Sequence, residues 1–150
     1  MNLSLEKPQK LYLLLSLFFV ANVLIAEFIG VKVFSLEDSF GINPVNWKIL
    51  DFTLSFQLTA GVLLWPVVFI FTDIINEYYG TRGVRRISYY AIAAITYSFI
   101  AVSLAMWLAP ADWWTMQDSP EGKINMQIAF SKIFGQGLWI IIGSVVAFLI

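Results

Sequence analysis

The chain has 150 residues, of which 59% are hydrophobic and 13% are charged, and its mean hydropathy is +0.78. This composition is too apolar for a soluble domain and favours a protein that is solvated by a lipid bilayer. The net charge of −1 gives no reason to expect a nucleic-acid partner. Cysteine and histidine are absent, which excludes disulfides and the usual zinc, haem and iron–sulfur ligands, so we expect no metal and no cofactor.

Four apolar segments follow one another along the chain. A bilayer core of about 30 Å needs about 20 mostly apolar residues at about 1.5 Å each. The segments that meet or approach this length cover residues 11–31, 54–78, 87–108 and 133–150. We therefore predict one all-α domain over residues 1–150, a polytopic transmembrane helical bundle with three complete spans and the start of a fourth. Because the last segment is still apolar at its end, we also expect a fragment of a longer protein.

The basic residues predict the orientation of these spans. Lysine and arginine are enriched in short cytoplasmic loops. They occur before the first span and between the second and third spans, as Lys7, Lys10, Arg82, Arg85 and Arg86. The N-terminus is therefore expected in the cytoplasm, and the polar segments 32–52 and 109–132 are expected outside.

The strongest candidates for a binding site lie at the end of the second span. Asp73 and Glu77 are four residues apart, so they share one face of a helix, and Asn76 adds a polar group beside them. Two interpretations stay open: the carboxylates bind substrate or carry a proton in a hydrated cavity, or they pair with the arginines of the next connection. Pro66 predicts a kink in mid-span, which favours the first interpretation, and Gly80 predicts the end of the helix.

The other spans hold fewer polar groups. Asn22 lies deep in the first span, where it either contacts substrate or hydrogen-bonds to a neighbouring helix. Glu27 lies near the outer end of the same span and is expected to reach the interface or Lys32. Small residues in the fourth span, including Gly143 and Ser144, are typical of close helix packing.

These residues together resemble a known family. The run Phe71-Thr72-Asp73, preceded by Pro66 and followed by Glu77, Tyr79 and Gly80, resembles the queuosine precursor transporter family, which is also called the vitamin uptake transporter or conserved-165 family. Asn22 in the first span and Ser144 with Ala147 in the fourth are similar to that family as well. Glu27 and Trp139 depart from it, since many relatives have basic residues at both places.

The resemblance implies a six-span bacterial inner-membrane protein, of which this chain would lack the C-terminal spans. It implies the import of 7-cyano- or 7-aminomethyl-7-deazaguanine, precursors of the modified tRNA base queuosine. A purine-like substrate offers paired N–H donors to a carboxylate, so the expected substrate-binding residues are Asp73, Glu77, Asn22 and Asn76. The expected partners are this small molecule and the lipid bilayer, and a homo-oligomer is left open.

Other functions are weighed against transport. A substrate-capture subunit for another heterocycle or vitamin would need a separate energising partner, because the chain has no phosphate-binding Gly-Lys-Ser/Thr loop. An enzyme is not expected, since paired acids without histidine, cysteine or a metal site offer little catalytic chemistry. A structural subunit would tolerate apolar residues in place of the polar residues in its spans, and a transporter would not.

Overall fold

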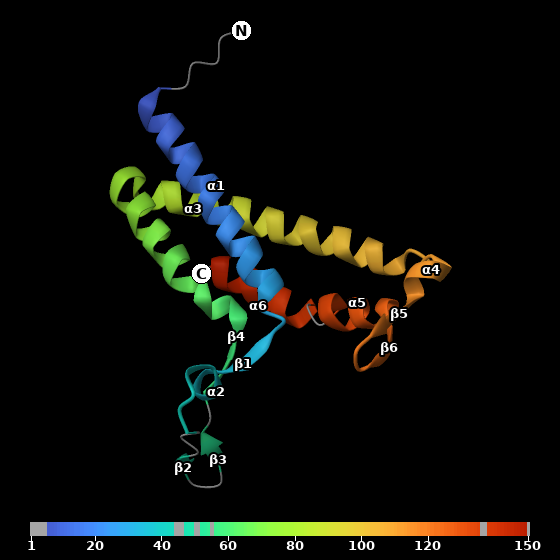
Figure 1. Cartoon of the computed structure of the whole chain (residues 1–150). Helices are drawn as coiled ribbons and strands as arrows, with labels where there is room; N and C mark the ends of the chain where they lie inside the picture. Colours follow the sequence, from blue (N-terminus) through green and yellow to red (C-terminus); the bar gives the residue numbers. More distant parts are fainter. Residues whose placement is uncertain (1–5, 44–46, 50–51, 55, 136–137, 150) are drawn as a thin grey trace.

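The computed structural model describes residues 6–43, 47–49, 52–54, 56–135 and 138–149, and these residues are mostly helical (Figure 1). The helical elements are α1 (Lys7–Ile29), α2 (Leu36–Phe40), the 3-10 helix η1 (Ala60–Leu63), α3 (Trp65–Trp107), α4 (Asp112–Thr115), α5 (Met126–Phe134) and α6 (Leu138–Leu149). The short strands form antiparallel pairs: β1 (Val33–Ser35) with β4 (Gln57–Thr59), β2 (Trp47–Ile49) with β3 (Phe52–Leu54), and β5 (Met116–Ser119) with β6 (Gly122–Asn125).

Two of the described helices, α1 and α3, are long and apolar enough to cross a membrane. Helix α1 begins with a capping box, in which the Glu6 amide donates to Gln9 Oε1 at 3.2 Å, and Pro8 occupies its first turn. It covers most of the first predicted span. Helix α3 contains the end of the second predicted span and nearly all of the third, so three separate complete spans stay a prediction.

The predicted start of the second span, near residue 54, is wrong. Residues 57–59 form β4, which pairs with β1, and α3 begins only at Trp65. The backbone groups of this segment bond to a strand that lies more than 20 residues earlier, so they are not available for a helix. Pro66 consequently lies in the first turn of α3 and does not kink it, because a proline in that turn needs no backbone N–H.

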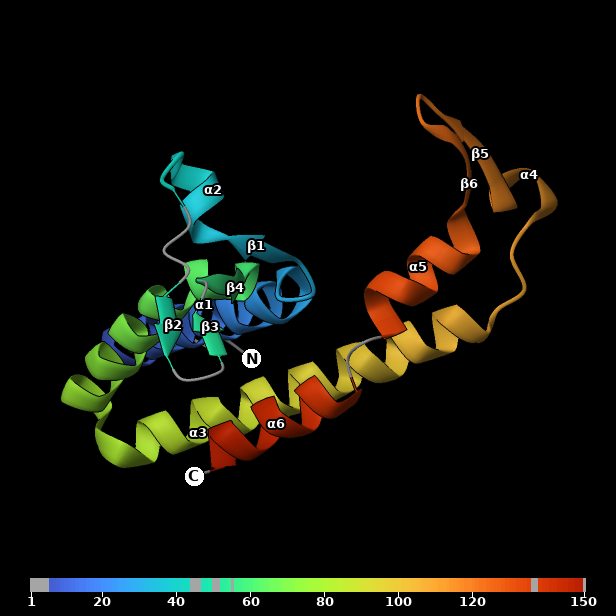
Figure 2. The ribbon, with the colours of Figure 1, turned by 90° about the horizontal axis from the view of Figure 1, so that it is seen from below.

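Helix α3 is broken at Gly80, where φ is 66° and ψ is −178°. This conformation is accessible to glycine and costly for other residues, which is why the chain turns here. The turn divides α3 into a first half, residues 65–79, and a second half, residues 81–107, and Figure 2 shows the sharp bend between them. The predicted helix end at Gly80 is thus confirmed, but the following arginines belong to the second half and not to a loop.

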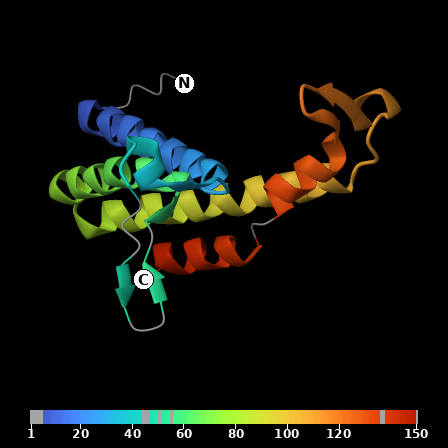
Figure 3. The ribbon, with the colours of Figure 1, turned by 60° about the horizontal axis from the view of Figure 1, so that its bottom comes forward.

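The core lies where α1 meets both halves of α3 (Figure 3). Its fully buried side chains recur at helical spacing: Phe19 and Val23 on α1, Val68 and Ile75 on the first half, and Ile87, Ala91 and Ile95 on the second half. Figures 2 and 3 both place α6 along the second half of α3, and the two helices are in contact. The predicted fourth span therefore corresponds to the end of α5 together with α6; Ile150 and the side chain of Trp139 lie outside the described residues.

A small lobe at the C-terminal end of α1 contains the β1–β4 pair and α2 (Figure 1). Glu37 is only 5% exposed there. Its Oε1 accepts from the Phe56 amide at 3.1 Å, and its Oε2 accepts from the Ser35 hydroxyl at 3.3 Å. The carboxylate thus joins α2 to the segment that precedes β4.

Replacement of this carboxylate is expected to loosen the lobe. Glu37→Ala removes the acceptor of the Phe56 amide from a part-buried hydrogen bond, and we expect the free energy of unfolding to fall by about 1–3 kcal/mol. Asp38→Ala, at the exposed neighbour, is the matched control and should change it much less. Thermal unfolding of both variants in detergent micelles measures the difference, and equal melting temperatures would contradict this role of Glu37.

Candidate functional site

A cavity of about 710 Å³ lies at the bend of α3, between its two halves and beside α1 and α6. We call it the elbow cavity. Its walls carry polar, aromatic and apolar side chains: Phe19, Trp65, Val68, Phe69, Thr72, Asp73, Asn76, Thr81, Val84, Arg85, Ser88, Tyr89 and Ala147. The volume is in the range of small-molecule sites, and a few convergent polar groups among apolar ones are typical of such sites.

Each half of α3 supplies one polar wall. Asp73 and Asn76 are three residues apart on the first half, so both side chains reach the same face. Thr81, Arg85 and Ser88 follow at intervals of four and three residues on the second half, which also places them on one face. The bend at Gly80 brings the two faces together, so a carboxylate on one wall and a guanidinium on the other border the same cavity.

The hydroxyl groups of this site are partly committed to the helix backbone. The Thr72 hydroxyl donates to the Val68 carbonyl at 2.8 Å, and the Ser88 hydroxyl donates to the Val84 carbonyl at 3.1 Å. Both oxygens keep lone pairs with which they can accept a hydrogen bond from a ligand.

The charged groups are not paired with one another. Among the residues that the structure describes, no salt bridge joins Asp73 or Glu77 to any of the three arginines that follow Gly80. The interfacial ion pair that the sequence left open is therefore not formed. A carboxylate and a guanidinium without a protein partner can each bind a polar ligand group strongly.

The structure separates the four predicted site residues into two pairs. Asp73 and Asn76 line the elbow cavity. Glu77 is exposed, lies one helical turn after Asp73, and does not line the elbow cavity. Asn22 lies on α1 outside the cavity, and its Nδ2 donates to the Phe18 carbonyl at 2.8 Å within the same helix. Substrate binding by these residues stays a prediction.

The contribution of the second half of α3 to the cavity was not predicted from the sequence. Arg85 and Tyr89 are four residues apart and lie on the same wall, with Ser88 beside them. The signal was available, because polar residues at 81, 85 and 88 have helical spacing. It was hidden by the assignment of the arginines to a connecting loop.

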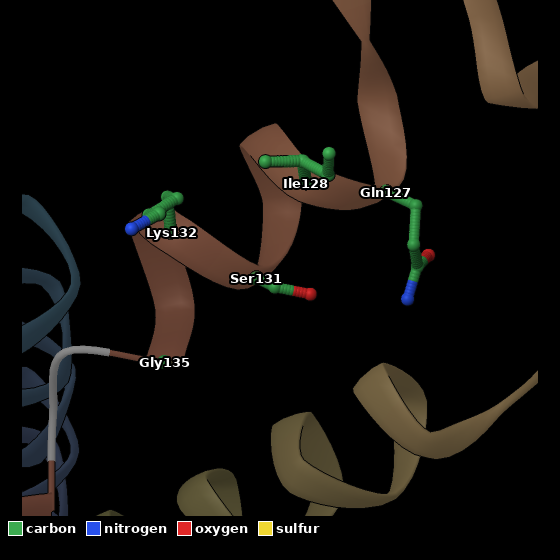
Figure 4. Close-up of a pocket in the computed structure, with 5 residues that line it drawn as sticks. All are labelled: Gln127, Ile128, Ser131, Lys132 and Gly135. Carbon is green, nitrogen blue, oxygen red and sulfur yellow. The ribbon is translucent and has the colours of Figure 1, made fainter.

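A second cavity, of about 470 Å³, lies beside α5 (Figure 4). It is lined by Gln127, Ile128, Ser131, Lys132 and Gly135. Figure 4 shows Lys132 pointing away from Gln127, whose Nε2 donates to the Met106 carbonyl at 3.2 Å. With no aromatic and no acidic side chain on its wall, this cavity is less suited to a planar heterocycle than the elbow cavity.

Comparison with known proteins adds one finding. Residues 59–150 match the model of a family that is described as "Putative vitamin uptake transporter". No curated protein and no solved structure matches the chain. The matched range includes the bend at Gly80 and every residue of the elbow cavity except Phe19.

Proposed function

Because the chain belongs to this family of vitamin uptake transporters, we propose that it is a bacterial inner-membrane protein that imports queuosine precursors through the elbow cavity. The substrates are 7-cyano- or 7-aminomethyl-7-deazaguanine. In this proposal the N-terminus and the bend of α3 lie at the cytoplasmic surface, and the lobe that contains Glu37 lies outside.

One observation carries the proposal: the elbow cavity holds an acidic and a basic side chain on its two walls, together with aromatic rings. A deazaguanine has a planar ring, two neighbouring N–H donors and a carbonyl acceptor. The Asp73 carboxylate matches the donors, which it can accept in pairs, and the Arg85 guanidinium matches the carbonyl. Trp65, Phe69 and Tyr89 supply surfaces on which the ring can stack.

The shape of the site also supports transport rather than permanent binding. Substrate sites of secondary transporters lie between groups of helices that move against each other during alternating access. The elbow cavity is lined by residues from both halves of α3, which meet at the bend at Gly80. The polar residues of the cavity come from both halves, so a change in the bend would alter their separation.

The test is uptake of labelled precursors, read out as queuosine in tRNA. The host cells lack their own transporter and their own precursor synthesis, and they express the full-length gene of this protein. We expect queuosine to be restored. We also expect excess guanine, which has the same donor edge, to compete, and adenine, which lacks it, to compete much less.

The outcome that would overturn the substrate assignment is the absence of queuosine although the protein is abundant in the membrane fraction. The protein would then remain a member of its family, and the ligand of the elbow cavity would be another small heterocycle or vitamin. If queuosine is restored but guanine and adenine compete equally well, Asp73 does not recognise the substrate through its two neighbouring N–H donors.

A further inference from the structure

A second polar site lies beside the bend in α3, on residues that do not line the elbow cavity. A groove of about 410 Å³ is lined there by Pro8, Gln9, Tyr12, Tyr79, Arg82, Gly83 and Arg86. None of these residues lines the elbow cavity, so the two sites use different faces of α3. Figure 1 shows that this part of α3 lies near the first turns of α1.

The walls of this groove are held by hydrogen bonds within the protein. The Tyr12 hydroxyl donates to the Gly83 carbonyl at 2.9 Å, and the Tyr79 hydroxyl donates to the Pro8 carbonyl at 2.8 Å. The two rings also pack edge to face, with their centroids 4.8 Å apart. Gly83 permits this packing, because a Cβ at that position would lie 2.7 Å from Tyr79 Cβ. The groove is therefore formed by the fold itself.

Two positive charges meet in the groove without an acidic partner. Arg82 and Arg86 are four residues apart, so they lie on one face of the helix, where like charges repel one another. In the described part of the chain no salt bridge neutralises either guanidinium. An anion bound between them would remove the repulsion, and a phosphate oxygen is well matched to the planar donors of arginine.

Exposed apolar and aromatic side chains lie next to residues of the groove. Leu11 is 45% exposed beside Tyr12, and Tyr90, one turn beyond Arg86 on the same face, is 53% exposed. Exposed apolar and tyrosine side chains next to basic residues are typical of the membrane interface, where headgroups and acyl chains are both in reach. A soluble phosphate would use the guanidinium groups alone, whereas a phospholipid would use both parts of the surface.

From these features we propose that Arg82 and Arg86 bind the phosphate of an anionic phospholipid at the cytoplasmic surface, in a groove whose walls include the rings of Tyr12 and Tyr79. Basic pockets between helices on this side of a membrane are known to bind acidic headgroups. The inference rests on the orientation given under the proposed function, but not on the substrate. A lipid in this groove would hold the bend of α3 against the bilayer.

The test is lipid binding to the purified full-length protein in neutral detergent micelles. Phosphatidylglycerol, phosphatidylcholine and inorganic phosphate are added in separate titrations, and binding is followed by native mass spectrometry and by the melting temperature. We expect phosphatidylglycerol to bind and to raise the melting temperature, and the other two to have little effect. The Arg82→Gln/Arg86→Gln double variant should bind phosphatidylglycerol about 25-fold more weakly, since each basic residue contributes about a factor of five.

Two control variants distinguish lipid binding in this groove from a nonspecific attraction of anionic lipid to positive charge elsewhere on the protein. The Lys123→Gln/Lys132→Gln double variant removes the same charge elsewhere and should bind like the wild type. Arg86→Lys keeps the charge without the fork of donors, so it should show an intermediate loss. If the double arginine variant does not fold, the two single arginine variants replace it.

Two outcomes would overturn the proposal: equal binding of phosphatidylglycerol by wild type and arginine variants, or an equal response to inorganic phosphate, which would identify a site for a free anion. Neither measurement uses a transport substrate. Failure of the lipid site and failure of queuosine precursor uptake are therefore distinguishable.

Discussion

Uptake of the precursor by an Asp73→Asn variant is expected to be lost at low substrate concentration, while a Glu77→Gln variant transports like the wild type. Asp73 lines the elbow cavity and Glu77 does not, although only one helical turn separates them. An asparagine presents one acceptor and one donor to a ligand edge that has two donors. The lost charged hydrogen bond is worth about 1.5–3 kcal/mol, which corresponds to an affinity about 10- to 150-fold weaker.

The comparison of the two acids is its own control, because both variants remove one negative charge from the same half of α3. Uptake is measured at several substrate concentrations, with the amount of each variant in the membrane determined in parallel. Normal uptake by Asp73→Asn would show that this carboxylate does not read the substrate. Equal loss in both variants would indicate that the two acids act as a unit, for instance in proton transfer, and not through contact with the ligand.

The second large effect is expected at Gly80. Gly80→Ala should reduce the free energy of unfolding by about 1–3 kcal/mol, because φ of 66° with ψ of −178° is a backbone conformation that residues with a Cβ strongly disfavour. A Cβ at Gly80 would meet nothing within 4 Å, so the loss would come from backbone strain and not from a clash. An uptake defect should accompany it, since relief of the strain changes the angle between the two walls of the elbow cavity.

Gly143→Ala in α6 is the matched control. Its Cβ would also have nothing within 4 Å, but this glycine has no positive φ. In a helix, alanine is more favourable than glycine by up to about 1 kcal/mol, so this variant should be as stable as the wild type or slightly more stable. Unfolding in detergent micelles measures both variants. A Gly80→Ala protein that melts and transports like Gly143→Ala would show that the bend does not depend on the glycine.

The long helices and the break between them could be predicted from sequence, since apolar length and a glycine after a helical pattern are local signals. The first span, predicted over residues 11–31, and the break at Gly80 illustrate this. The start of α3 could not be predicted in the same way. The pairing of β4 with β1 joins residues 57–59 to 33–35, and hydropathy within one segment contains no information about such a pairing. The wrong prediction of a kink at Pro66 followed from the wrong helix start. A proline kinks a helix when it lies in the interior, but it is well tolerated in the first turn.

Only one wall of the candidate site could be predicted from the sequence. Asp73 and Asn76 could be chosen because carboxylates and amides are unexpected in an apolar segment. Arg85 and Ser88 could not be chosen as long as the arginines were taken as a loop, since their place on the opposite wall depends on the bend at Gly80. Asn22 was chosen for its depth in the span, but its Nδ2 donates to the Phe18 carbonyl of its own helix and the side chain does not line the elbow cavity.

The two tyrosine hydrogen bonds at the start of α1 have a mechanical consequence. Tyr79 on the first half of α3 holds Pro8, and the second half is held at Gly83 by Tyr12. Helix α1 therefore acts as a brace across the bend, and the angle at Gly80 cannot change much unless at least one of these bonds opens. If the two halves must swing for the cavity to face each side of the membrane in turn, the opening of this brace is an energy barrier in every transport cycle, and the frequency of its opening sets an upper limit on the turnover rate.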